Sequence, residues 1–149
     1  IDIAFEPVIR ACAAPRSVQE GTWLLPEMID AYRTLNQSGH AHSFEVWHGD
    51  DLVGGLYGVA IGQLFFGESM FSRRSDASKI ALSLLAEVAL AQPYRLIDCQ
   101  VYTAHLSRLG AREIPRAEFQ QALTAAVDAP AAPLMSRPRR SAGSLRWVA

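Results

Sequence analysis

The strongest constraint on the fold is a run of alternating apolar and polar residues between positions 43 and 71. Side chains of a β-strand point alternately to the two faces of a sheet, so this period of two predicts strands rather than helices. Gly49-Asp50-Asp51 and Gly62 interrupt the run where tight turns are expected. The segments between these turns read SFEVWH, LVGGLYGVAI and QLFFGESMF. They predict three consecutive strands in an antiparallel meander.

Helical patterns flank this meander on both sides. Residues 5–14 and 26–38 precede it. After it, a helix capped by Ser75 or Asp76 is expected to run until Pro93. The apolar positions of this helix recur every three or four residues: Ala77, Ile80, Ala81, Leu84, Leu85 and Val88. We therefore expect it to pack one face on the sheet.

The rest of the chain predicts one more strand and two more helices. The strand is expected at residues 95–102, followed by a short helix from about Ala104 to Gly110. A brief extended piece and a helix opened by Pro115 come next. The whole pattern predicts the α+β class with an acetyltransferase-like (GNAT-type) architecture, a mixed and largely antiparallel sheet flanked by helices. Such a fold does not by itself define a function.

Composition and charge favour one folded domain, which we expect at residues 1–128. Half of the 149 residues are hydrophobic and the formal net charge is −1, which argues against a chain that is disordered as a whole and against a general polycation. Residues 129–149 are rich in Pro and Arg without an apolar period, so we expect a flexible tail there. Ile1 is not a start methionine and no signal peptide follows it, so we expect the chain to begin inside a longer protein.

Several residue patterns exclude other classes of protein. No apolar run approaches the ~20 residues that cross a bilayer, which predicts no membrane partner. Cys12 and Cys99 lie far apart without a CxxC spacing, which argues against a disulfide framework and fits a reducing cytoplasm. The histidines lack acidic or cysteine partners at ligand spacing, so we expect no metal site.

Three polar residues interrupt apolar, strand-like runs: Glu68, Asp98 and Gln100. A buried polar group is costly unless it has a partner or a function, so these are candidate site residues. Alternation along the expected strand places Asp98 and Gln100 on one face, with Cys99 on the other. This arrangement predicts that Asp98 orients the Gln100 amide, and that Cys99 is not a nucleophile. Glu68 could instead be an exposed strand residue or an ion-pair partner.

Several motifs then occur in one order along the chain. They are GTW at 21–23, HSFEVWHGDDLVGGLYGVAIGQLFFGESMFSRRSDASKIAL at 42–82, LIDCQV at 96–101 and LGAREIP at 109–115. With these motifs, the chain from about Phe5 to Leu123 resembles the leucyl/phenylalanyl-tRNA–protein transferase family. The resemblance implies transfer of Leu or Phe, with Met as a further candidate, from aminoacyl-tRNA to an N-terminal Lys or Arg of acceptor proteins, which marks them for degradation by the N-degron route. It implies no metal or coenzyme, and we expect a monomer. Within this resemblance, we expect the family's smaller N-terminal domain to be absent from this sequence.

The resemblance also implies roles for individual residues. Asp98 and Gln100 match the family's proposed catalytic pair, and Glu68 matches its acceptor-site carboxylate. Trp23 matches an aromatic residue that stacks near the 3′-terminal adenosine. Phe65 matches a residue of the pocket for the transferred side chain. The neighbouring substrate-binding residues are expected to be Leu56, Gly67 and Ser69.

Within this resemblance, we expect Gln100 to hold the incoming amine through its side-chain carbonyl, because a neutral amide is a very weak base. Asp98 would fix the orientation of that amide. The proton would leave by Asp98, water or the departing ribose oxygen.

Arg73, Arg74 and Lys79 cluster where the helix after the meander begins. Free amides and cations at a helix start can hold phosphate, so these residues are candidates for contacts with tRNA phosphates. An ordinary solvated helix cap explains the cluster equally well.

Two other functions fit the same fold. A coenzyme A-dependent N-acetyltransferase would need a glycine-containing loop before this helix, whereas the chain has FSRRSDASK there. The glycines of GGLYG match no nucleotide-binding loop, and bulges or close packing within the sheet explain them better. A folded interaction domain without activity is the second alternative.

Overall fold

The computed structural model describes residues 1–14, 22, 24–130, 134 and 146–148. Its centre is a mixed sheet of five strands in the order β1-β2-β3-β4-β5. The first three strands form the predicted antiparallel meander: β1 (Ala41–His48), β2 (Asp51–Ile61) and β3 (Leu64–Ser72). Strands β4 (Leu96–Asp98) and β5 (Arg146–Val148) continue the sheet in parallel to β3. The predicted α+β class is confirmed.

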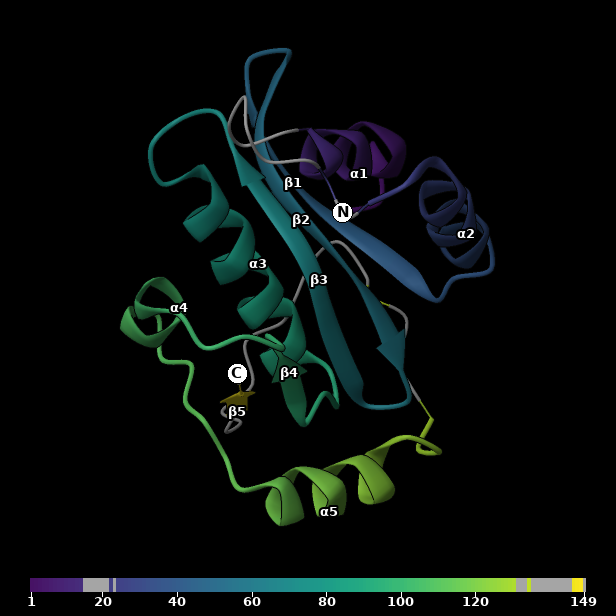
Figure 1. Cartoon of the computed structure of the whole chain (residues 1–149), viewed down its shortest axis with the longest axis vertical. Helices are drawn as coiled ribbons and strands as arrows, with labels where there is room; N and C mark the ends of the chain where they lie inside the picture. The colour runs from purple at the N-terminus through teal and green to yellow at the C-terminus, as the bar shows by residue number, and fades with distance from the viewer. Residues whose placement is uncertain (15–21, 23, 131–133, 135–145, 149) are drawn as a thin grey trace.

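Helices cover both faces of this sheet (Figure 1). Helices α1 (Phe5–Ala13) and α2 (Pro26–Gln37) pack on one face, and α3 (Ala77–Ala91) packs on the other. Helix α4 (Ala104–Arg108) follows β4, and α5 (Arg116–Ala126) lies across the end of the sheet near β4. In the described part of the chain, no helix is both long and apolar enough to cross a membrane.

The two faces of the meander bury separate apolar clusters because its side chains alternate. Towards α3, the rings of Phe44 and Phe65 meet edge to face, with 5.8 Å between their centroids. Towards α1 and α2, the ring of Tyr57 packs against Tyr32, with 5.1 Å between the centroids. These clusters fix the middle of β2 and β3, where the candidate site residues lie.

Two glycines of β2 allow close approaches, as the sequence predicted. A Cβ atom on Gly54 would lie 2.5 Å from the Cβ of Ala77, so α3 could not pack so closely on a larger residue. A Cβ atom on Gly58 would lie 2.2 Å from the carbonyl oxygen of Phe66. The β2–β3 register shifts between Tyr57 and Gly58, so both bulging and close packing account for these glycines.

Strand β4 is shorter than the segment 95–102 expected from the sequence. Pairing with β3 ends where Phe66 meets Asp98, and Gln100 adopts a positive φ of 62°. A left-handed backbone cannot continue a strand, so the chain turns away from the sheet at this point. The alternation expected for residues 98–101 therefore does not hold.

Strand β5 lies within the segment expected to be a flexible tail. Arg146–Val148 pair in parallel with Leu96–Asp98. For these three residues the expectation of a tail without secondary structure is wrong. The paired segments lie far apart in the sequence, and a local apolar period cannot reveal such a contact.

Candidate functional site

Glu68 occupies a β-bulge in the middle of β3. Tyr57 of β2 pairs with Ser69 and the next residue, Gly58, pairs with Gly67, so Glu68 is the extra residue between them. A bulge interrupts the ladder and redirects the side chain of the inserted residue. The bulge therefore shifts the alternation of β3, so that Phe65 before it and Met70 after it both face the α3 cluster although they are five residues apart.

The carboxylate of Glu68 has a partner on α2. Burial, and then a hydrogen bond to Glu68 and its negative charge, raise the pKa of Tyr32 to about 12. Tyr32 consequently stays a neutral phenol at physiological pH and donates its hydroxyl proton to the carboxylate. Sequence reasoning missed Tyr32, because nothing in the pattern of α2 indicates which strand residue it faces.

Gln100 bridges the gap that opens where β3 and β4 part. Its side-chain Nε2 donates a hydrogen bond of 3.0 Å to the carbonyl oxygen of Gly67, the residue before Glu68. Its backbone N–H donates a bond of 2.8 Å to Oδ1 of Asp98. The expectation that Asp98 orients the Gln100 amide is thus wrong in its detail. Asp98 holds the backbone turn, and Gly67 holds the amide.

A cavity of about 490 Å³ lies beside these groups. Its walls are mostly apolar, and its polar positions include Glu68, Thr103 and His105. The apolar walls come from β2, β3, α3, β4 and α4: Leu56, Met70, Leu82, Leu85, Ile97 and Leu106. We call this space the apolar cavity. It has the character of a ligand site, a largely apolar hollow edged by a few polar groups.

Four predicted site residues line the apolar cavity: Leu56, Gly67, Glu68 and Ser69. Phe65 does not line it but is fully buried in the core cluster beside Leu56 and Ile97. Trp23 lies outside the described residues. The structure therefore gathers most of the expected substrate-binding residues at one place.

Cys99 lies on the wall of this cavity, where the sequence had placed it on the opposite face from the site. The difference follows from the early end of β4. Burial, and then the charge of Asp98, raise the pKa of the Cys99 thiol to about 11. A thiol that stays protonated is a poor nucleophile, so the expectation that Cys99 is not the nucleophile is retained for a different reason.

A second, smaller cavity of about 350 Å³ also reaches Glu68. It lies between α2 and the sheet, and its lining is mainly apolar: Met28, Ala31, Tyr32, Leu35 and Val59. Glu68 lines both cavities. Glu68 is thus shared between the two hollows, and its carboxylate lies beside Tyr32 of α2.

The three expected phosphate-binding cations differ in their surroundings. Arg73 donates to the carbonyl oxygen of Leu52 at 3.1 Å and lies over the ring of Phe71. Lys79 forms an ion pair with Asp76, which lowers the pKa of that carboxyl. All three are exposed, and of the three Arg73 lines a described cavity.

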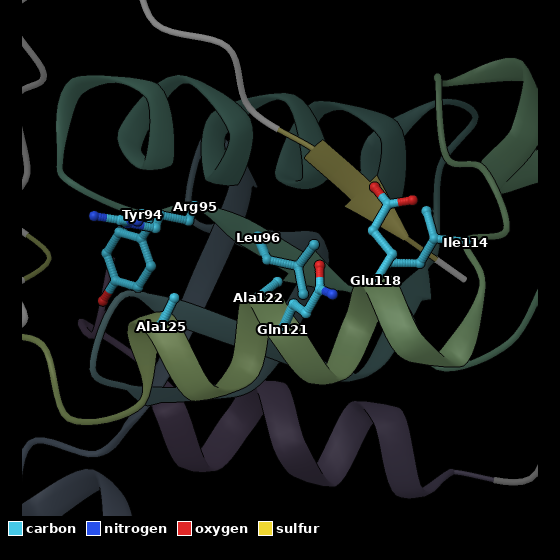
Figure 2. Close-up of a pocket in the computed structure, with 8 residues that line it drawn as sticks. All are labelled: Tyr94, Arg95, Leu96, Ile114, Glu118, Gln121, Ala122 and Ala125. Carbon is cyan, nitrogen blue, oxygen red and sulfur yellow. The ribbon is translucent and has the colours of Figure 1, made fainter.

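Another hollow of about 490 Å³ lies between β4 and α5. Figure 2 shows Gln121, Ala122 and Ala125 of α5 facing Tyr94 and Leu96 across it. It contains none of the expected site residues.

In the described parts of the chain, no three His, Cys, Asp or Glu side chains gather as a metal site. The apolar cavity remains the candidate site.

The fold and this cavity define an α+β protein with an apolar candidate ligand site, lined in part by Glu68, where two strands of a mixed sheet part. The family model described as leucyl/phenylalanyl-tRNA protein transferase matches residues 1–124. The chain belongs to this family.

Individual relatives agree with the family match. A leucyl/phenylalanyl-tRNA–protein transferase of Nitrosomonas eutropha is 61% identical over 129 residues, which are 87% of this chain and 55% of the relative. Its counterpart in an Anaeromyxobacter species is 58% identical over 130 residues, with the same coverage. One from a Shewanella species is 51% identical over 133 residues, 89% of this chain and 56% of the relative. The chain thus spans about half the length of the curated relatives it matches.

Proposed function

We propose that this chain transfers leucine or phenylalanine, and also methionine, from aminoacyl-tRNA to the N-terminal Lys or Arg of acceptor proteins. The proposal rests on the family match and on the names of relatives that are 51–61% identical. The role is one step of an N-degron pathway in the cytoplasm, and it needs no cofactor. The catalytic unit is residues 1–128, a monomer with an acetyltransferase-like fold.

The apolar cavity is the proposed site for the side chain of the transferred amino acid. Its walls offer aliphatic contacts from Leu56, Leu85 and Ile97, among others. Such contacts discriminate weakly, by about 1–3 kcal/mol per methylene group. A cavity of about 490 Å³ can accordingly accept more than one bulky apolar side chain. The family name, which couples leucine with phenylalanine, agrees with this tolerance.

Glu68 is the proposed partner of the acceptor's positive charge. An N-terminal Lys or Arg carries a cationic side chain, and a carboxylate with one fixed hydrogen bond is a suitable partner for it. Tyr32 supplies that bond from α2. Because Glu68 lines both cavities, it can contact an acceptor without leaving the edge of the donor site.

Gln100 and Asp98 are proposed to position the amine. With its Nε2 bound to the Gly67 carbonyl, the Gln100 amide can accept a hydrogen bond from the amine through its Oε1, which has no partner among the described residues. Asp98 maintains the left-handed turn that presents this amide. An aminoacyl ester is already activated, so holding the two reactants together supplies much of the acceleration.

The reaction needs one new bond and one broken bond. The neutral α-amine attacks the ester carbonyl carbon, a C–N bond forms, and the C–O bond to the ribose breaks. The nitrogen loses a proton and the ribose oxygen gains one. The pKa of an unperturbed α-amine is about 7.7–8.0, so part of it is already neutral at working pH.

Four further residues are proposed to contact the tRNA 3′ end: Trp23, Arg73, Arg74 and Lys79. Phosphate contacts dominate affinity for nucleic acid, and a net charge of −1 gives this chain no general attraction for it. The donor contacts must therefore be local. Arg73 has the best support, since it lines a cavity next to the apolar one.

A transfer assay tests the proposal. Radiolabelled leucyl-tRNA is incubated with the chain and a peptide that starts with Arg, beside the same peptide starting with Asp. We expect label in the Arg peptide and little in the Asp peptide. A parallel reaction with acetyl-coenzyme A should give no acetylated peptide, since residues 71–79 lack the glycine loop of that class. Acetylation without leucine transfer would overturn the proposal, and so would inactivity in both assays.

A further inference from the structure

A third cavity adjoins the apolar one. It has a volume of about 500 Å³ and lies between the end of α1, the end of β3 and the start of α3. Met70 and His105 line both cavities. The two hollows are therefore adjacent at these two residues. We call the third one the polar cavity.

The polar cavity differs from its neighbour in chemistry. Beside apolar residues such as Met70 and Phe71, its lining includes Ser72, Arg73 and Ser78. The hydroxyl of Ser72 also bonds to the backbone, donating to the carbonyl of Arg74 at 2.7 Å. These are groups that contact sugar hydroxyls and phosphate oxygens. The pair of cavities fits a two-part ligand, with an apolar end in one hollow and a sugar with phosphate in the other.

An aminoacyl nucleotide is such a ligand, and its ester joins the two parts. If the amino-acid side chain fills the apolar cavity and the ribose enters the polar cavity, the ester lies at their junction. Met70 has no proton to exchange, whereas the ring of His105 can donate one. Among the described residues, the half-buried His105 ring has no hydrogen-bond partner, so its nitrogens are free to meet a ligand.

We propose that His105 is a catalytic residue that donates a proton to the ribose oxygen as the ester C–O bond breaks. This role rests on the function proposed above and goes beyond the pair Asp98 and Gln100. The imidazolium proton passes to the leaving oxygen while the C–N bond forms. The amine nitrogen releases its own proton to water, and the imidazole takes one back from water. Atoms and charge then balance over one turnover.

The groups around His105 are consistent with this role. Glu68 and Cys99 face it across the apolar cavity, and Arg73 and Cys12 face it across the polar cavity. Cys99 stays protonated because burial and Asp98 raise its pKa to about 11. Asp98 is a weaker candidate for the proton donor, since its Oδ1 accepts the backbone N–H of Gln100.

The test compares two leucine donors that differ in whether the leaving group must be protonated. One is leucyl-tRNA, whose alkoxide leaving group needs protonation. The other is the thiobenzyl thioester of leucine, whose thiolate leaves without it. In His105→Gln we expect kcat with leucyl-tRNA to fall about 100-fold while KM stays within about twofold. With the thioester, kcat/KM should stay within about threefold of the unsubstituted chain.

His48→Gln is the matched control, because His48 is an exposed histidine at the β1–β2 turn and lines no described cavity. This variant should transfer leucine from both donors at the rate of the unsubstituted chain. Circular dichroism melts of both variants show whether they fold. An equal loss with both donors would assign His105 a structural role and overturn the proposal, as would an unchanged kcat with leucyl-tRNA. If the unsubstituted chain transfers leucine from the thioester but not from leucyl-tRNA, the proposed function fails, and this role fails with it.

Discussion

The side-chain Nε2 of Gln100 donates a 3.0 Å hydrogen bond to the carbonyl oxygen of Gly67. This bond spans the opening between β3 and the turn after β4, and it ends next to the bulged residue Glu68. One contact thereby ties the amide proposed to hold the amine to the backbone of the residue before Glu68.

Replacing Gln100 by Ala should lower kcat/KM for transfer by about 10- to 100-fold, because the amine loses the oxygen that positions it. Asp98→Asn keeps an oxygen that can accept the Gln100 backbone N–H, so we expect a loss of only about threefold. Asp98→Ala removes this acceptor and should behave like Gln100→Ala. Steady-state transfer to an Arg peptide measures all three. Near-normal turnover in both alanine variants would remove the pair from the mechanism.

Tyr32→Phe should weaken acceptor binding without affecting the donor. The variant loses the hydroxyl that donates to Glu68, so the carboxylate is less well fixed. We expect KM for an Arg peptide to rise about tenfold, equivalent to about 1.4 kcal/mol, and KM for leucyl-tRNA to stay the same. Tyr102→Phe, at an exposed tyrosine, is the control. A rise in KM for leucyl-tRNA instead would show that Tyr32 contributes to donor binding, which would contradict this prediction.

Gly58→Ala and Gly67→Ala should separate folding from function. A methyl group on Gly58 would overlap the Phe66 carbonyl, so we expect a loss of about 1–3 kcal/mol in the free energy of unfolding. On Gly67 the nearest atom is the Asp98 carbonyl oxygen at 3.4 Å, an ordinary contact. That variant should fold normally but transfer more slowly, because its methyl group enters the apolar cavity. Urea denaturation and the transfer assay measure the two effects, and equal stability of the variants would contradict this prediction.

Leu56→Phe should change the choice of donor. Leu56 lines the apolar cavity and is 3% exposed, so a larger ring there reduces the space for the transferred side chain. We expect the ratio of kcat/KM for leucine over phenylalanine to rise about tenfold. Ile61→Phe, at an exposed position on the same strand, should leave the ratio unchanged. An unaltered ratio in Leu56→Phe would mean that the side chain binds elsewhere.

The thiol of Cys99 should react slowly at neutral pH. Its pKa of about 11 lies well above the 9.0 of an unperturbed thiol, which lowers the thiolate fraction at pH 8 about 100-fold. In a Cys12→Ser background, alkylation by iodoacetamide should be correspondingly slow at pH 8. Because the thiolate is the reactive form, the rate should increase about tenfold per pH unit until about pH 11. Rapid, pH-independent alkylation would show that the thiol is not buried as described.

Much of the fold follows from local patterns. Alternation and turn residues predicted β1, β2 and β3, and the three- and four-residue spacing predicted α3, because burial of one face of each element requires those periods. Within α3 the predicted stripe was wrong at Ile80, which is exposed, whereas Leu82 is buried. The family motifs also indicated Glu68, Asp98, Gln100 and Leu56 from the sequence alone. Sequence motifs are therefore sufficient to identify these candidate site residues.

Tertiary structure alone decided how those residues meet. The bulge at Glu68, the left-handed turn at Gln100 and the parallel strand β5 all depend on pairing between distant segments. The same holds for Tyr32 facing Glu68 and for His105 at the junction of two cavities. Sequence periodicity reports which side of an element is buried, whereas these features depend on which other element lies against it. That choice is made by packing in three dimensions.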